Sequence, residues 1–241
     1  MKKVLALVLT LAIATLALAG CGFDPSVKSE GVMTHAEYMA AEIDDEVTIE
    51  AFVQAKQVRN AEYGNTTLYL QDTVGGYFVY RLECTEEEYN TIKVGSRLKI
   101  TGYKTEWAGE VEIADAEFEV LDGTYVATYT DVTSLLDSDD LVDYQNMKVY
   151  FTGMTIEEAN EDGDAFLYNW DGSGEDGSDL YFNASVDGKT YTFVIETDLV
   201  GNDSDVYAAV KNLNVGDKVD MAGFLYWYEG VQPQITSVTV K

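Results

Sequence analysis

Two stretches of this sequence, 121 residues apart, share one pattern. Residues 92–103 read IKVGSRLKITGY, and residues 213–224 read LNVGDKVDMAGF. Both place glycine at the fourth and eleventh positions and apolar residues at the seventh and ninth. The agreement extends to Trp107 and Gly109, which fall opposite Tyr228 and Gly230. Self-similarity at a fixed spacing indicates one structural unit used twice, so we expect two domains, at 31–125 and 126–241.

The first unit alternates apolar and polar residues as half-buried strands do. Five strands are predicted, at 47–53, 66–70, 77–82, 97–105 and 110–121. A turn sequence rich in residues that tolerate positive φ, Asp72 to Gly76, joins the second and third strands. Thr85 with Glu88 three residues later forms a capping box, which predicts a short helix before the fourth strand.

The second unit repeats this order. Its strands are expected to begin near Val149, to form a hairpin over 180–195, and to close over 219–226 and 234–240, with a helix capped near Asp203 or Ser204. Helical prefaces are predicted after Thr34 and over 131–144. Five strands with a helix between the third and fourth is the order of an OB-fold barrel. The predicted class is therefore all-β with short helices, arranged as two tandem five-stranded OB-fold barrels.

A longer motif in the first unit carries a resemblance to a known family. Residues 69–80, YLQDTVGGYFVY, with Val94-Gly95 and Thr101-Gly102 downstream, resemble bacterial OB-fold domains of the nucleic-acid-binding superfamily. Such domains occur in secreted nucleases and in uncharacterised lipoproteins of Gram-positive gut bacteria. The resemblance implies the fold, and it implies nucleic-acid binding as an expectation. The second unit departs from the motif, because an acidic insertion at 160–179 interrupts its early strands.

The N-terminal residues have the pattern of a targeting signal. Lys2 and Lys3 precede an apolar run over 4–18 that is short for a membrane span and typical of a secretory signal. The run ends in Leu-Ala-Gly-Cys21, which looks like the lipobox of bacterial lipoproteins. This resemblance implies a signal peptide at 1–20, a diacylated Cys21, a short polar tether at 21–30, and a lipid-anchored domain on the extracytoplasmic side of the cell envelope membrane. An ordinary signal peptide or anchor helix with a chance cysteine is the alternative. Cys84 is expected to be a small buried residue.

Charge argues against a polyanionic partner. The chain holds 43 acidic and 15 basic residues, a formal net charge of -28. Binding to a phosphate backbone normally draws its affinity from lysine and arginine, and the second unit has no arginine. One reservation is that five basic residues lie on predicted strands of the first barrel: Lys56, Arg59, Arg81, Lys99 and Lys104. The high negative charge also favours a monomer.

Aromatic residues suggest a ligand face. Tyr226-Trp227-Tyr228 falls at the turn between the last two strands, where consecutive side chains cannot all point inward. An exposed aromatic there would stack on a sugar or a base, or anchor a protein. The alternative is that Tyr226 and Tyr228 cover one barrel end while Trp227 packs on the preface helix. The candidate ligand-binding residues are Tyr69, Gln71, Tyr80, Arg81, Tyr103, Trp107, Tyr226, Trp227 and Tyr228.

The acidic insertion contains the opening of a calcium loop. Asn169, Asp171 and Ser173, followed by Gly174, match the first oxygen ligands and the glycine of such a loop. Position 12, however, is Leu180 rather than a bidentate glutamate, so a solvated acidic loop is the alternative. Calcium is the one cofactor considered, and otherwise none is expected.

The sequence holds no recognisable catalytic constellation. It has no nucleophile elbow, P-loop or HExxH, and His35 is its one histidine, expected at the surface. We therefore expect a non-enzymatic binding or adaptor module for an extracytoplasmic glycan or protein partner. The alternatives are single-stranded nucleic-acid binding through the first barrel, which requires salt dependence and loss on Arg81→Ala, and a purely structural envelope subunit.

Overall fold

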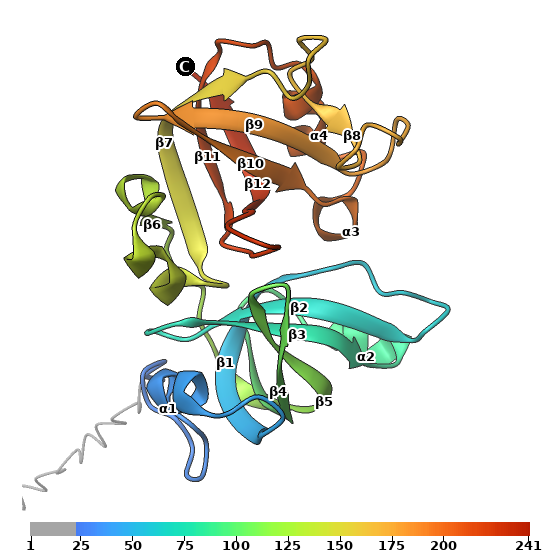
Figure 1. Ribbon diagram of the computed structural model, residues 1–241. Coiled ribbons are helices and arrows are strands. Elements are labelled where there is room, and N and C mark those ends of the chain that lie inside the picture. Colours follow the sequence, from blue (N-terminus) through green and yellow to red (C-terminus); the bar gives the residue numbers. More distant parts are fainter. Residues whose placement is uncertain (1–22) are drawn as a thin grey trace, which may run out of the picture.

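The computed structural model describes residues 23–241 as two β-barrels, one above the other in Figure 1. The predicted signal peptide and Cys21 lie outside the described residues. No helix in the described part is long and apolar enough to cross a membrane. The first half consists of α1 (His35–Ala40), β1 (Glu46–Lys56), β2 (Asn65–Gln71), β3 (Gly76–Glu83), α2 (Glu86–Thr91), β4 (Ser96–Trp107) and β5 (Glu110–Thr124).

The second half begins after Thr124. It consists of β6 (Thr130–Asp131), two 3-10 turns η1 (Thr133–Leu135) and η2 (Asp139–Tyr144), β7 (Lys148–Glu157), β8 (Leu167–Tyr168), β9 (Leu180–Val186), β10 (Lys189–Ile195), α3 (Thr197–Val200), α4 (Asp205–Lys211), β11 (Lys218–Phe224) and β12 (Gln234–Val240).

Both halves close in the same order. Barrel 1 runs β1-β2-β3-β5-β4 and closes where β4 pairs with β1. Barrel 2 runs β7-β9-β10-β12-β11 and closes where β11 pairs with β7, while β6 and β8 add short edges. Each barrel encloses its own apolar core, built around residues such as Ile49 and Leu98 in the first and Phe151 and Met221 in the second. The predicted all-β class with two five-stranded barrels is confirmed.

The repeated glycine marks the same close approach in both barrels. Gly102 pairs with Val47, and Gly223 pairs with Val149. A Cβ on Gly102 would lie 2.8 Å from the carbonyl oxygen of Ala114, and one on Gly223 would lie 2.1 Å from that of Gln234. The last strand of each barrel therefore passes too close for any side chain, which explains why the sequence repeats glycine there.

The capping predictions in barrel 1 are confirmed, and the helical preface of barrel 2 is corrected. Thr34 and Thr85 form reciprocal capping boxes with Glu37 and Glu88. The preface predicted over 131–144 is not an α-helix: it forms two 3-10 turns, because Asp131 and Ser138 turn the chain with their own side-chain bonds.

The predicted tether is docked rather than free over its described residues. Lys28 Nζ lies 2.6 Å from the buried carboxylate of Asp72 and donates to the carbonyl of Glu50. Phe23 packs edge-on against Phe52 at 5.8 Å. Burial alone would raise the pKa of Asp72, but the Lys28 ammonium and the N–H groups of Gly75 and Val74 outweigh it and hold that pKa below its usual value. Residues 23–30 are thus part of barrel 1.

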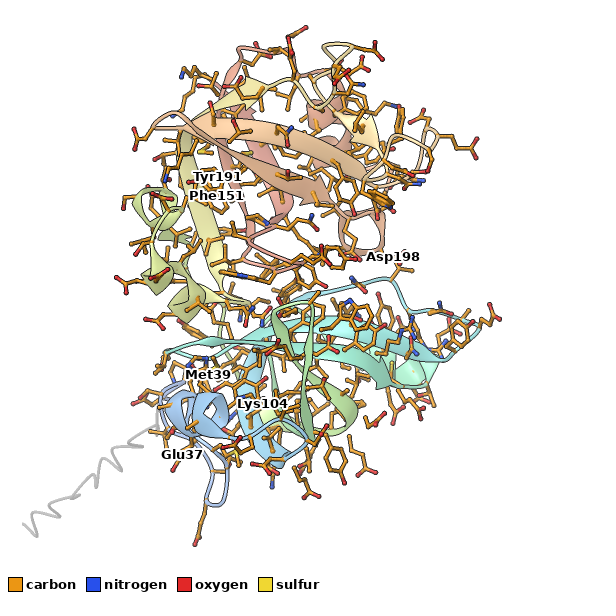
Figure 2. The ribbon with its side chains drawn as sticks, in the orientation of Figure 1. Glu37, Met39, Lys104, Phe151, Tyr191 and Asp198 are labelled. Atoms are coloured by element: carbon orange, nitrogen blue, oxygen red, sulfur yellow. The ribbon has the colours of Figure 1, made fainter. Side chains whose placement is uncertain are left out.

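Lys56 and Lys104, two of the five basic residues noted on the predicted strands of barrel 1, have structural roles. Lys56 donates to the carbonyls of Tyr89 and Ile92 at the end of α2. Lys104 donates to the carbonyls of Met39 and Ala41 at the end of α1, and Figure 2 shows it beside Met39. Unpaired carbonyls at a helix C-terminus attract cations, so these lysines are not available to a ligand.

Of two predictions about single residues, one is confirmed and one is corrected. Cys84 is buried, as expected. His35, expected at the surface, is half-buried, because its ring packs against Tyr77 at 5.2 Å.

Candidate functional site

The face of barrel 1 that should bind a ligand is covered by barrel 2. Tyr69 is fully buried and stacks on Phe224, with ring centroids 4.2 Å apart and an interplanar angle of 17°. Phe78, beside Tyr69, packs against Tyr226 at 5.5 Å. The prediction that Tyr69 lies on an open face is therefore wrong: the outward aromatic pair on β2 and β3 forms a third apolar cluster between the barrels.

Polar groups seal the edges of this contact. The hydroxyl of Tyr69 donates to Gln234 Oε1 at 2.8 Å, and Gln71 Oε1 accepts from the backbone N–H of Lys148 at 2.9 Å. Gln71 thus also belongs to the contact between the barrels and is not free to bind a ligand. On the far side, the N–H of Val58 donates to the carbonyl of Asp198 at 2.7 Å, and Figure 2 labels Asp198 at the boundary between the barrels.

Glu110 is a fully buried acid within this contact. One carboxylate oxygen accepts from the backbone N–H of Trp227 at 2.9 Å. The other, Oε1, has no partner, and neither does Oδ1 of Asn146 nearby. Burial raises the pKa of Glu110 to about 8, so the group is mostly protonated at neutral pH.

One part of the predicted face remains open, at the end of β3. Tyr80 and Arg81 are consecutive, yet both are exposed. The cause is a bulge: the register of β2 and β3 shifts between Thr66 and Leu68, and Arg81 has a φ of 49°. A bulge redirects a side chain that regular alternation would turn inward. The Arg81 guanidinium lies 4.9 Å from the centroid of the Tyr80 ring.

This pair borders a cavity of about 270 Å³ at the junction of the barrels. Its wall includes Asn60 from the β1–β2 loop, Thr67 from β2 and Tyr226 from barrel 2. Within the described residues, the Arg81 side chain makes no ion pair or hydrogen bond, whereas Arg59 is held by the carbonyl of Cys84 at 2.8 Å. Arg81 is thus the cation at this cavity that is ready to meet a ligand.

The other predicted aromatics are dispersed. Trp107, 64% exposed, and Tyr103 lie on β4 of barrel 1 and border neither this cavity nor the one described next. Tyr226 is half-buried against barrel 1. Trp227 is half-buried, with its indole 3.4 Å from where a Cβ on Gly109 would lie. Tyr228 is 47% exposed. The nine candidates therefore do not form one face. Some lie in the contact between the barrels, Tyr80 and Arg81 form an exposed pair, and the others are separate surface residues.

A larger cavity, of about 660 Å³, opens on barrel 2. Its floor is the row Tyr181, Val194 and Gln234, which are register partners across β9, β10 and β12. Trp170, 75% exposed, and Tyr228 also line it. The sequence analysis missed Trp170 and Tyr181. Trp170 lies inside the acidic insertion. A large aromatic residue among many acidic ones was the signal in the sequence that could have identified it as a candidate ligand residue.

In the suspected calcium loop, oxygen atoms accept hydrogen bonds from backbone N–H groups of the same loop. Asp171 Oδ1 accepts the N–H of Ser173 at 3.0 Å, and the N–H of Gly174 donates to the carbonyl of Tyr168. Asn169 adopts a φ of 60°. Among residues 23–241 there is no group of three or more histidine, cysteine or acidic side chains arranged for a metal. Calcium binding at Asn169, Asp171 and Ser173 stays a prediction.

Comparisons with known proteins return structures alone. The chain matches no protein-family model and no curated protein. Among solved structures it is similar to the Ifi202 HINa domain in complex with 20-bp dsDNA, with 12% identity, a TM-score of 0.36, and coverage of 82% of this chain and 98% of that one. It is also similar to p202 HIN1 in complex with a 12-mer dsDNA, with 12% identity, a TM-score of 0.33, and 91% and 99% coverage.

A third similar structure is a Replication Protein A heterotrimer bound to ssDNA, with 12% identity, a TM-score of 0.32, and coverage of 82% of this chain and 49% of that one. What these proteins bind is a property of those proteins. The two-barrel architecture described above rests on this chain's own strand pairings.

The expected glycan or protein adaptor is corrected at this point. That function required the aromatic faces of the barrels to be open, and Tyr69, Gln71 and Phe78 are instead buried against barrel 2.

Proposed function

We propose that the protein binds single-stranded nucleic acid, without catalysis, at the open end of β3 in barrel 1. The observation that carries the proposal is the Tyr80–Arg81 pair, held outward by a bulge beside a cavity. An aromatic ring offers a base a stacking surface, and an adjacent guanidinium meets its phosphate or stacks in turn. Asn60 and Thr67 supply polar groups at the cavity wall.

The geometry limits the footprint. Barrel 2 covers the rest of the face on β2 and β3, so only the length of β3 beyond Phe78 is open. Two acidic residues, Glu196 and Asp198, border the same cavity and oppose a phosphate. We therefore expect a short site with an affinity in the range of non-specific binding, about 10⁻⁴ to 10⁻⁶ M.

The test is fluorescence anisotropy of a labelled ten-nucleotide strand across a salt series. One or two neutralised phosphates predict a slope of log K against log salt near about −1, since each contributes roughly −0.7 on a single strand. Arg81→Ala is expected to weaken binding about tenfold, and Tyr80→Ala by a similar factor because stacking contributes about 1–3 kcal/mol. Lys93→Ala removes the same charge outside the cavity wall and serves as the control.

Two outcomes would end this proposal. One is the absence of binding at low salt. The other is an Arg81→Ala variant that binds no worse than Lys93→Ala, since generic charge would then account for the whole signal. Competition by an unlabelled duplex of the same length separates single-strand from double-strand preference.

We also infer that the protein is anchored through Cys21 on the extracytoplasmic side of a bacterial membrane. The basic pair, the apolar run and the Leu-Ala-Gly-Cys21 ending support this proposal, and two acyl chains make anchoring stable where one is marginal. Cys21→Ser is expected to release the protein from the membrane fraction of expressing cells. Retention of the variant in that fraction would contradict lipidation at this residue.

A further inference from the structure

The cavity on barrel 2 differs in kind from the one beside Arg81. Four aromatic side chains line it: Trp170, Tyr181, Tyr226 and Tyr228. Trp170 keeps 75% of its surface exposed and Tyr228 keeps 47%. Large aromatic residues left this open around a hollow are a common feature of ligand sites, because a ligand's own surface completes their burial.

Its charged groups all have one sign. Asp179, Glu196 and Glu229 line the cavity, and no lysine or arginine does. Asp179 is fixed, because its Oδ1 accepts from both the N–H and the hydroxyl of Thr197 at 2.7 Å. The negative charge at that wall is therefore held in place by the fold rather than free to swing into solvent.

Glu196 provides an unsatisfied acceptor. Its Oε1 accepts from Gln57 Nε2 at 2.7 Å, and its Oε2 is buried without a partner. Burial, with Asp179 and Asp198 close by, raises the pKa of Glu196 to about 7. Glu196 lines the cavity, and a cation there would favour its charged form.

We propose that this cavity binds a small organic ammonium ion, its charge facing the three acids and its carbon groups packed against Trp170, Tyr181 and Tyr228. Aromatic faces attract cations through their negative electrostatic potential, and desolvation strengthens the attraction. The volume of about 660 Å³ is ample for a ligand of this size. An inorganic cation would leave the aromatic walls without a partner, and a phosphate-bearing ligand would meet only like charge.

Isothermal titration calorimetry on the purified protein tests the proposal with three probes. Choline carries a quaternary ammonium group, putrescine carries primary ammonium groups, and 3,3-dimethyl-1-butanol is the neutral isostere of choline. Choline or putrescine is expected to bind, with the isostere at least tenfold weaker than choline. Which of the two cations binds better distinguishes recognition of methylated from primary ammonium.

Variants locate the site. Trp170→Ala and Glu196→Gln are each expected to weaken binding of the preferred cation at least fivefold, while Trp170→Phe keeps most of it. Trp107→Ala removes another exposed tryptophan, on barrel 1 and outside the cavity, and is expected to change nothing. Far-ultraviolet circular dichroism confirms that each variant is folded.

Three results would overturn the proposal: neither cation binding at millimolar concentration, the isostere binding as well as choline, or Trp170→Ala binding like Trp107→Ala. The outcome is independent of nucleic-acid binding. Arg81→Ala is expected to leave cation binding intact, and Trp170→Ala is expected to leave oligonucleotide binding intact, so either proposal can fail alone.

Discussion

The two barrels present different residues at the same place on the same fold. In barrel 1, Leu68 and Val79 pair inside the core, and the next pair along, Tyr69 with Phe78, points outward. In barrel 2 the core pair is Phe182 with Phe193, and the next pair is Asn183 with Thr192. The aromatic pair is covered by the other barrel. The polar pair is half-exposed and hydrogen-bonded to itself, Thr192 Oγ1 to Asn183 Oδ1 at 2.9 Å.

This difference shows what decides how identical architectures associate. Topology gives each barrel the same outward row, and side-chain chemistry at two positions decides whether that row needs a partner. An apolar row gains free energy from being covered, whereas a row that satisfies its own hydrogen bonds gains little. Barrel 1 is accordingly the buried partner of the contact, and barrel 2 keeps its face, with the cavity at Tyr181, open.

The largest loss of stability is expected from removing the aromatic side chain of Tyr69, which barrel 2 covers. Tyr69→Ala removes a fully buried ring, its stacking on Phe224 and its bond to Gln234, and should lower the free energy of unfolding by about 3–5 kcal/mol. Asn183→Ala, the counterpart in barrel 2, should cost about 1 kcal/mol. Urea denaturation of both variants measures the contrast. Equal losses would mean that the contact between the barrels contributes no more than a surface hydrogen bond.

Much of the fold could be predicted from the sequence, because its signals are local. Alternation placed the strands, capping boxes placed α1 and α2, and the repeated glycine revealed the duplication. The contact could not be predicted. Tyr69 occupies an outward position by alternation, which reads as exposed, and its cover comes from Phe224 in the other barrel. Alternation also could not show why the consecutive residues Tyr80 and Arg81 are both exposed, since a bulge leaves no periodic signal.

The ligand sites were predictable only in part. Tyr80 and Arg81 were among the nine candidates, and the structure leaves them together at the surface. Trp170 was missed because it sits in an irregular loop, where position follows from tertiary packing alone. Lys56 and Lys104 looked like ligand residues because sequence does not show that a helix end lies within reach of each.

A smaller effect should appear in how the joint responds to pH. The pKa of Glu110 is about 8 in the folded chain and near 4.5 when exposed, so the folded state binds the extra proton between these values. Stability should therefore fall as pH rises through this window, by up to about 1.4 kcal/mol per pH unit. The negative charge of Glu112 nearby adds to the effect of burial in raising the pKa of Glu110.

Glu110→Gln separates this contribution from others. The variant keeps an acceptor for the Trp227 N–H and cannot ionise, so its stability should fall less steeply between pH 5 and 8. Glu196 remains in the variant and accounts for a residual slope. Thermal unfolding followed by circular dichroism at several pH values gives the comparison. Parallel curves for the variant and the parent protein would show that Glu110 does not carry the extra proton.

The smallest effect concerns residues 23–30, whose side chains Phe23 and Lys28 contact barrel 1. Lys28→Ala breaks the contact with Asp72 and should lower stability by about 1 kcal/mol, since the Lys28 side chain is partly exposed. The expected signature is faster hydrogen exchange over residues 23–30 and in the Asp72 turn, with barrel 2 unchanged. Unaltered exchange in the segment would show that Phe23 and its neighbours hold it without the ion pair.

The contact between the barrels also has a symmetry. Two copies of a unit can meet through the same patch, which closes the assembly, or through two different patches, which leaves one of each unused. Here the β2–β3 face of barrel 1 meets Phe224 and Tyr226 of barrel 2, so the contact is of the second, open kind. Repeated, it would build a filament of barrels. Asn183 and Thr192 stand where the next unit would attach, and because they bond to each other they offer it no apolar surface.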